Sequence, residues 1–255
     1  MNTAFDYVDA AVKSPTTVPD GNRDLCGYAL AVCFRNFLTI EEASAIVERV
    51  YANRESWSPG FDGEQFAIGE VWYHFRETGQ PIDTYLQIAE ASRTLVETVA
   101  PGLHNRIVSH LRRVVTPDDV RLRPGWAGPG IMVFPVGERV ADVGGTAHVD
   151  WDGLSADEAA DPNLRAYSFV CMLQKPASGG GLSVWPRMEV GGDGRDLDDV
   201  DVSGCEPLTI DYQVGDLWMF RSMCAHAIDS FQGPIDRICL TFHAARREHR
   251  WDVWF

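Results

Sequence analysis

The stretch Gly144-Gly145-Thr146-Ala147-His148-Val149-Asp150 places a histidine and an aspartate two residues apart. On an extended strand, residues i and i+2 point to the same face, so His148 and Asp150 can reach one ion while Val149 packs the other way. The two glycines before them permit an irregular approach into that strand. The stretch therefore predicts a strand that carries two ligands of a metal ion.

The tripeptide needs support from its context. With seven histidines and 23 aspartates in 255 residues, about 0.6 His-x-Asp strings are expected by chance. A third ligand is available in His226, which follows the Gly215-Asp216 turn and the apolar run 217–220 and enters the next strand from a facing edge. Two imidazoles and one carboxylate form a facial metal site with open positions. We expect His148, Asp150 and His226 to bind the metal.

An arginine follows the second histidine by 11 positions, at Arg237. The segment 237–243 reads as a strand on which Arg237, Cys239 and Thr241 share one face. A guanidinium offers a planar fork that matches a carboxylate, and it is costly to bury without such a partner. Arg237 is thus a candidate for holding an acidic co-substrate. His243, on the same strand, is expected to be a structural histidine.

The second half of the chain has the sequence pattern of a β protein. Short runs rich in β-branched and aromatic residues are separated by Gly, Pro and Asp clusters, at 130–136, 167–173, 182–185, 208–210, 217–220 and 237–243. Their spacing suits a jelly roll of two sheets that enclose a site. The expected fold is mainly β with flanking helices that support one sheet.

The first half is expected to be largely helical. Thr39 and Glu42 form a capping box for a helix over 40–53, Pro81 suits the start of a helix that runs to 99, and a third is expected over 103–114. A strand is expected over 27–34. The aromatic-rich segment 56–80 is expected to be a loop that packs on the sheet as core or covers the site as a lid.

One domain is expected over residues 1–255, as all-β domains of this size are routine. We divide it into an N-terminal arm (1–25), a helical support with a possible lid (26–115), a jelly-roll core (116–250) and an aromatic tail (251–255). The segment 191–202 is acidic and rich in glycine and is expected to be an exposed loop. A calcium site there is disfavoured, because the segment lacks the order of oxygen ligands of an EF-hand loop.

Composition narrows the partners. The net charge of −15 disfavours nucleic acid, which needs a basic surface. The N-terminus lacks the features of a signal peptide, and no stretch approaches the roughly 18 apolar residues of a membrane helix. The six cysteines have no metal-binding spacing, which favours reduced thiols. A soluble, cytoplasmic protein without a membrane partner is expected, and its oligomeric state stays open.

The ordered motifs resemble those of a known superfamily. His148-x-Asp150, Gly180-Gly181-Leu182-x-Val184-Trp185, Gly215-Asp216-Leu217, His226 and Arg237 are similar to the Fe(II)/2-oxoglutarate-dependent oxygenases, above all to prolyl-hydroxylase-like small-molecule hydroxylases. The likeness covers roughly residues 120–245. It implies a double-stranded β-helix, iron held by the three ligands, 2-oxoglutarate on the metal with its 5-carboxylate on Arg237, and O₂ as oxidant.

The resemblance also has two departures of interest. Many members have a hydroxyl residue two positions after the arginine, where this chain has Cys239. Thr241 or another residue would have to supply the second contact to 2-oxoglutarate. In addition, halogenating members have a small residue at the position of Asp150, so hydroxylation or another oxidative step is favoured here.

The substrate side is the least defined by sequence. Trp151 and Asp152 follow the ligand pair directly, and Arg76 could meet an acidic group, so these three are candidate substrate neighbours. We expect a small molecule such as an amino acid or a biosynthetic intermediate, oxidised with release of succinate and CO₂. Two alternatives stay open. A cupin-like metalloenzyme without 2-oxoglutarate would leave Arg237 facing solvent or a structural carboxylate, and in a non-catalytic binding module the three ligands would not converge.

Overall fold

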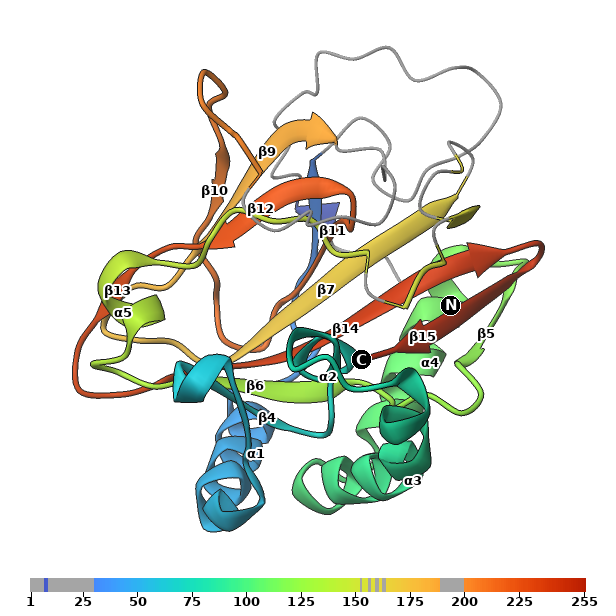
Figure 1. The fold of residues 1–255 in the computed structure, drawn as a ribbon, viewed down its shortest axis with the longest axis horizontal. Coiled ribbons are helices and arrows are strands. Elements are labelled where there is room, and N and C mark those ends of the chain that lie inside the picture. Colours follow the sequence, from blue (N-terminus) through green and yellow to red (C-terminus); the bar gives the residue numbers. More distant parts are fainter. Residues whose placement is uncertain are drawn as a thin grey trace.

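The computed structural model describes residues 7–8, 30–151, 153–155, 157–158, 161, 164–188 and 200–255. A large twisted sheet runs through the molecule, with most helices on one side and two small sheets on the other (Figure 1). The order along the large sheet is β1 (Tyr7–Val8), β2 (Ala31–Phe34), β11 (Leu217–Arg221), β7 (Arg165–Gln174), β14 (Arg237–Arg247), β6 (Gly130–Phe134), β4 (Gln65–Ile68) and β3 (Ser58–Gly60). Two more strands, β15 (Arg250–Trp254) and β5 (Asp119–Leu122), extend it beside β14.

The second layer consists of short strands. A three-stranded sheet has the order β10 (Leu208–Ile210), β9 (Leu182–Met188) and β12 (Cys224–Ile228), and β13 (Phe231–Gln232) pairs with β8 (Ser178–Gly179). The turn at residues 222–223 connects β11 of the large sheet to β12 of the small one. Mainly antiparallel strands in two facing layers form the expected jelly roll, and the prediction of a mainly β fold is confirmed.

Three helices lie where the sequence predicts them: α1 (Ile40–Ala52), α3 (Ile82–Val99) and α4 (Leu103–Val115). Two short helices, α2 (Trp72–Glu77) and α5 (Arg139–Val143), and the 3-10 turns η1 (Arg54–Ser56) and η2 (Phe61–Gly63) were not predicted. The capping box of α1 is present: Glu42 N donates to Thr39 Oγ1 at 3.1 Å, and Thr39 N donates to Glu42 Oε2 at 2.8 Å. Helix α1 packs on β7, and α3 packs on β4 and β6.

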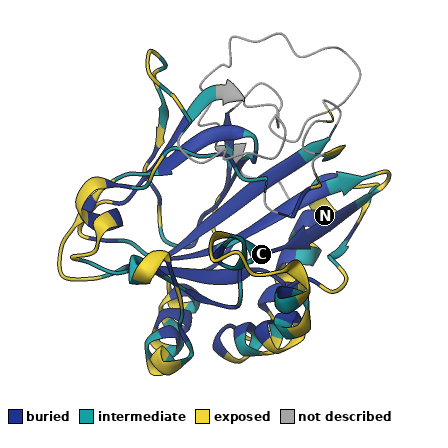
Figure 2. Cartoon of the chain, in the orientation of Figure 1, coloured by how far each residue is buried: buried dark blue, intermediate teal, exposed yellow. Residues whose placement is uncertain are grey.

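The two faces of the large sheet have different neighbours. On β7, Tyr167, Phe169 and Cys171 face the helices, whereas Val170 and Met172 face the small sheets. Residues on both faces are buried, which Figure 2 shows as dark blue strands. The face toward the small sheets, here called the inner face, is mainly apolar. Polar residues on it therefore call for an explanation.

The Gly215-Asp216 turn closes the loop before β11. Gly215 has φ 87°, and a Cβ there would lie 2.1 Å from the carbonyl oxygen of Leu38, so only glycine fits. Asp216 accepts hydrogen bonds from Asn36 N at 2.9 Å and from Arg35 Nη1 at 2.5 Å. This turn has a structural role that ties β11 to the loop after β2.

Two local predictions were wrong. Residues 56–80 are not a loop, because β3, β4 and α2 lie there and β4 pairs with β6. His148 lies in a single antiparallel bridge with His226 and not in a strand. In both cases pairing with a distant segment decides the conformation, and a local pattern does not report it.

The aromatic tail packs in the core. Its residues lie in or directly after β15, which pairs with β14, and Trp251 and Trp254 are buried.

Some predictions lie outside the described residues. They concern the N-terminal arm apart from residues 7–8, residues 27–29 of the first strand, most of the acidic loop 191–202, and Asp152. Within the described part of the chain the five cysteines Cys33, Cys171, Cys205, Cys224 and Cys239 are free thiols. The helices of that part are all too short or too polar to span a membrane.

Candidate metal centre

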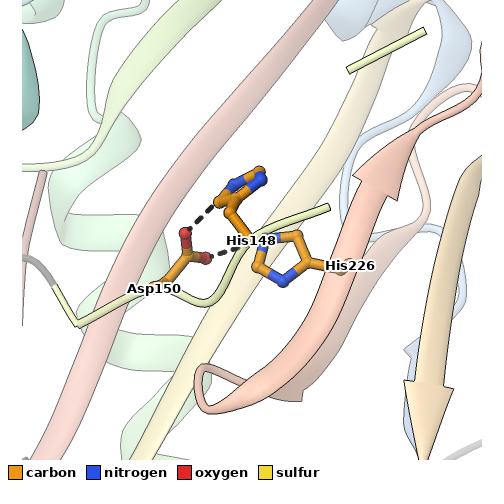
Figure 3. A group of neighbouring side chains, drawn as sticks. All are labelled: His148, Asp150 and His226. Atoms are coloured by element: carbon orange, nitrogen blue, oxygen red, sulfur yellow. Dashed lines mark ion pairs between the residues drawn. The ribbon is translucent and has the colours of Figure 1, made fainter. Parts of the chain in front are cut away.

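Three side chains converge at one edge of the space between the sheets. One ligand atom from each of His148, Asp150 and His226 lies within 4.8 Å of the others. Asp150 Oδ2 is 3.2 Å from His226 Nε2, and Asp150 Oδ1 is 3.6 Å from His148 Nε2. Figure 3 shows the carboxylate and both rings pointing toward one another, with His226 on β12 and the other two on the segment beside it.

Backbone pairing sets this arrangement. His148 N donates to His226 O at 3.0 Å, and His226 N donates to His148 O at 2.9 Å, so the two histidines lie side by side. Asp150 N donates to Ser222 O at 2.7 Å. Because Ser222 lies in the turn between the two sheets, Asp150 is fixed at the corner where they meet. Val149, between the two ligands, is buried, in line with the alternation of side chains along extended backbone.

Both imidazoles are oriented by main-chain carbonyls. His148 Nδ1 lies 2.8 Å from Thr146 O, and His226 Nδ1 lies 3.0 Å from Cys224 O. A carbonyl oxygen only accepts, so each Nδ1 carries a hydrogen. In the neutral ring Nε2 then carries the lone pair that can bind a metal, which is how metal-binding histidines are commonly held.

Charges within the triad stabilise one another. Burial raises the pKa of the Asp150 carboxyl, but the imidazoles of His226, His243 and His148 more than offset this, and the net pKa lies below its ordinary value. Burial lowers the pKa of His226, and the Asp150 carboxylate raises it above its ordinary value. The carboxylate of Asp150 thus favours the protonated form of His226, and the imidazoles favour the ionised form of Asp150.

The donor set fits a divalent transition metal. Two ligand atoms each about 2.1 Å from an ion and at right angles lie about 3 Å apart. The two carboxylate oxygens of Asp150 each lie near this distance from one histidine, Oδ2 at 3.2 Å from His226 Nε2 and Oδ1 at 3.6 Å from His148 Nε2. Two nitrogens and one oxygen on adjacent corners leave the remaining positions open. The side chain of His148 is 36% exposed and that of Asp150 is 15% exposed, so the site is accessible from solvent.

Arg237 is buried on the inner face, 1% exposed. Its Nε donates to Gly180 O at 2.9 Å and its Nη1 to Cys239 Sγ at 3.3 Å. Its guanidinium carbon lies 5.1 Å from the ring centroid of Phe134 and 5.5 Å from that of Tyr212. No carboxylate among the described residues forms an ion pair with it. The glycine run 179–181 is thus explained in part: Gly180 orients this arginine.

Tyr212 is a residue that the sequence analysis missed. It is fully buried next to Arg237, and its hydroxyl has no hydrogen-bond partner in the described structure. Burial raises its pKa, and Arg237 opposes that shift, so the hydroxyl keeps its proton. No local signal marked it, since it follows β10 in a segment without a motif.

The remaining predicted residues lie at two places. Thr241 lies on the inner face of β14 with Arg237 and Cys239, and it is only half-buried although β14 has neighbours on both sides. On the substrate side, the guanidinium carbon of Arg76 lies 5.4 Å from the ring centroid of Trp151. Thus α2 reaches the residue that follows the ligand Asp150, while Asp152 lies outside the described residues.

Comparisons with known proteins identify the fold. No family model and no curated protein matches this chain. An N-substituted L-amino acid dioxygenase from Burkholderia ambifaria AMMD superposes with a TM-score of 0.53 at 13% identity, over 89% of this chain and 86% of that one. Its complex with α-ketoglutarate gives a TM-score of 0.51 at 13% identity, with the same coverage. The epimerase SnoN, in complex with Fe³⁺, α-ketoglutarate and nogalamycin RO, gives 0.49 at 13% identity, over 86% and 82%.

Identities this low show a shared fold. The jelly roll of this chain matches the fold of a dioxygenase over most of both chains. At the level of the fold, the resemblance of this sequence to the Fe(II)/2-oxoglutarate-dependent oxygenases is confirmed.

Proposed function

We propose that this protein is an Fe(II)- and 2-oxoglutarate-dependent oxygenase that oxidises, and most simply hydroxylates, a C–H bond of a small molecule. The observation that carries the proposal is Arg237. A guanidinium that is 1% exposed and has no carboxylate partner among the described residues is costly unless an anion joins it. It lies on the inner face of the sheet beside which the metal triad converges.

The same observations weigh against the two alternatives. A cupin-like enzyme without 2-oxoglutarate predicts an Arg237 that faces solvent or a structural carboxylate. Neither fits, because Arg237 is buried and donates to Gly180 O and Cys239 Sγ. A non-catalytic binding module predicts ligand residues that do not converge, whereas these lie within 4.8 Å. Both facts support an enzyme that binds a metal and an acidic co-substrate.

Each residue then has a defined task. His148, Asp150 and His226 would hold Fe(II), and with 2-oxoglutarate and O₂ this metal supplies C–H oxidation with release of succinate and CO₂. Arg237 would pair with the 5-carboxylate of 2-oxoglutarate. The Tyr212 hydroxyl, which has no partner among the described residues, would donate the second hydrogen bond, because the thiol of Cys239 is a weaker donor than a hydroxyl. Thr241 stays the alternative donor.

The substrate is proposed to approach past Arg76 and Trp151. Their contact joins α2 to the residue after Asp150, so both lie near the metal. The Burkholderia ambifaria structure is that of an enzyme for N-substituted L-amino acids. A small acidic molecule such as an amino acid would suit the guanidinium of Arg76 here. The net charge of −15 disfavours nucleic acid as a substrate.

An anaerobic titration tests the proposal. Fe(II) is added to the metal-free protein, 2-oxoglutarate follows, and the visible spectrum is recorded. A weak charge-transfer band that needs both additions is expected. Bound iron without that band would overturn the proposal, because it would mean that 2-oxoglutarate does not chelate the metal. A screen of amino acids for stimulated succinate release then identifies the substrate class.

A further inference from the structure

Behind the three candidate ligands lies a polar cluster that none of the roles above uses. It consists of Ser168 on β7, Ser222 in the turn between β11 and β12, and His243 on β14. Their exposed fractions are 1%, 2% and 7%. Three polar side chains gathered on a mainly apolar face are costly to bury unless they bond one another.

The hydrogen bonds in this cluster have fixed directions. Ser168 Oγ lies 2.5 Å from Asp150 Oδ2, 2.9 Å from Ser222 Oγ and 3.2 Å from His243 Nδ1. An ionised carboxylate only accepts, so the single hydrogen of Ser168 goes to Asp150. Ser168 must then accept from both Ser222 and His243. This assignment uses its one hydrogen and both lone pairs, and it places a hydrogen on His243 Nδ1.

The cluster holds Asp150 through both its backbone and its side chain. Ser222 accepts from the backbone N of Asp150 at 2.7 Å through its own carbonyl, and Ser168 binds the side chain. Rotation of the carboxylate is therefore restrained. Its Oδ2 accepts from Ser168 and lies 3.2 Å from His226 Nε2, whereas Oδ1 lies 3.6 Å from His148 Nε2 and accepts no hydrogen bond from the other described residues.

We propose that Ser168, supported by Ser222 and His243, is a positioning residue for Asp150 that reserves Oδ1 as the metal-binding oxygen. The inference rests on the proposed metal site and assigns it a support of its own. A carboxylate that binds through one oxygen leaves three positions free around the ion, as a bound 2-oxoglutarate and O₂ require. If both oxygens bound, one of these positions would be lost.

The experiment measures metal affinity in the full-length protein. Ser168→Ala is compared with wild type by anaerobic calorimetry with Mn(II), and the melting temperature of each metal-free variant is recorded. We expect Mn(II) to bind about 10- to 100-fold more weakly in Ser168→Ala, which is the usual effect of losing such a supporting group. Ser168→Thr keeps the hydroxyl and should restore most of the affinity.

A matched control is available on β9. Ser183 is also buried, and its Oγ donates to Asp229 Oδ1 at 2.7 Å and to none of the three ligands. Ser183→Ala removes an equivalent serine–carboxylate bond and should leave Mn(II) affinity unchanged. Equal affinities in Ser168→Ala and wild type, or equal losses in both alanine variants, would overturn the proposal.

A second variant keeps the test decisive if Ser168→Ala does not fold. His243→Asn places an amide donor near the position of Nδ1, whereas His243→Leu removes the donor without adding one. Mn(II) affinity should follow the order wild type, Asn, Leu, and the reverse order would contradict the inference. If wild type itself binds no Mn(II), the metal site fails, and with it the proposed function. Binding by wild type with no effect of the variants refutes only the role of Ser168.

Discussion

The guanidinium carbon of Arg237 lies 5.5 Å from the ring centroid of Tyr212, and both side chains are almost fully buried. Arg237 donates to Gly180 O and Cys239 Sγ but pairs with no carboxylate among the described residues. The Tyr212 hydroxyl has no hydrogen-bond partner among them. Two unmet donors side by side suit one bound carboxylate, which accepts from both. The first two predictions follow from this relationship.

Tyr212→Phe should weaken 2-oxoglutarate binding and leave the protein as stable as before. The lost hydrogen bond corresponds to about 1 kcal/mol, or about a fivefold rise in Kd. The hydroxyl has no hydrogen-bond partner among the described residues, so its removal breaks no bond with them. Calorimetry with 2-oxoglutarate on the Mn(II)-loaded protein gives the Kd, and urea unfolding gives the stability.

Tyr51→Phe is the control for a tyrosine whose hydroxyl stabilises the fold and does not bind 2-oxoglutarate. The Tyr51 hydroxyl accepts from Gln174 Nε2 at 2.8 Å and donates to Asp236 Oδ2 at 3.1 Å. Its loss should lower the free energy of unfolding by about 1 kcal/mol or more and leave the Kd of 2-oxoglutarate unchanged. If Tyr212→Phe behaves like Tyr51→Phe, the tyrosine is structural and Thr241 becomes the better candidate.

Arg237→Met should abolish tight 2-oxoglutarate binding without destabilising the metal-free protein. Two charge-assisted hydrogen bonds lost at about 1.5 kcal/mol each correspond to at least 100-fold in Kd. Replacement of a buried, incompletely compensated charge by an apolar side chain is often neutral or stabilising. Mn(II) affinity should stay the same. A drop in unfolding free energy of more than about 1 kcal/mol, or a parallel loss of Mn(II), would assign Arg237 to the fold.

Metal binding should strengthen with pH. The carboxylate of Asp150 raises the pKa of His226, and a metal must displace that proton. One displaced proton changes the apparent affinity about tenfold per pH unit. The stability of the metal-free protein should change with pH in the opposite direction to metal affinity. The contribution of the His226–Asp150 pair is complete below the ordinary histidine pKa and is lost as pH rises through the raised value.

The rise in melting temperature on Mn(II) addition should therefore be larger at pH 8 than at pH 6. Asp150→Asn should lose both the metal effect and the part of the pH trend in the metal-free protein that comes from His226. A metal-induced shift independent of pH would mean that His226 is neutral before the metal binds.

The sequence predicted those features that local patterns encode. Thr39 and Glu42 marked the start of α1 because a capping box needs only four consecutive residues. His148 and Asp150 share a direction because extended backbone alternates, even without a full strand. The Gly-Asp turn placed His226 at the entry of β12 for a similar reason.

What the sequence did not predict depends on strand order. Ser168 and His243 are 75 positions apart and meet because β7 and β14 are neighbours. Tyr212 reaches Arg237 from another layer. The aromatic tail forms a strand because β14 and β5 each offer it an edge. Such contacts follow from the assembled sheet, so no pattern within one segment could reveal them.

Acid should destabilise the protein through a histidine remote from the metal. His74 is buried on α2, and burial lowers its pKa to about 4. Between pH 6.5 and 4 the unfolded chain binds a proton that the folded chain does not, so the free energy of unfolding falls by about 1.4 kcal/mol per pH unit. His74→Phe removes this contribution.

Urea unfolding of wild type and His74→Phe at several pH values measures the effect. The variant is expected to start less stable at pH 7, since Gln65 loses its contact with His74 Nε2 at 3.1 Å, and to lose less stability as the pH falls. Parallel curves would show that the pKa of His74 is the same in the folded and the unfolded chain. The hydrogen bond and ring contacts of His74 are with Gln65, Phe61 and Tyr73, and not with the three ligands. If His74→Phe reduces the loss of activity in acid and leaves Mn(II) affinity unchanged, that loss is due to unfolding. If the loss of activity persists in the variant, it is due to protonation at the metal site.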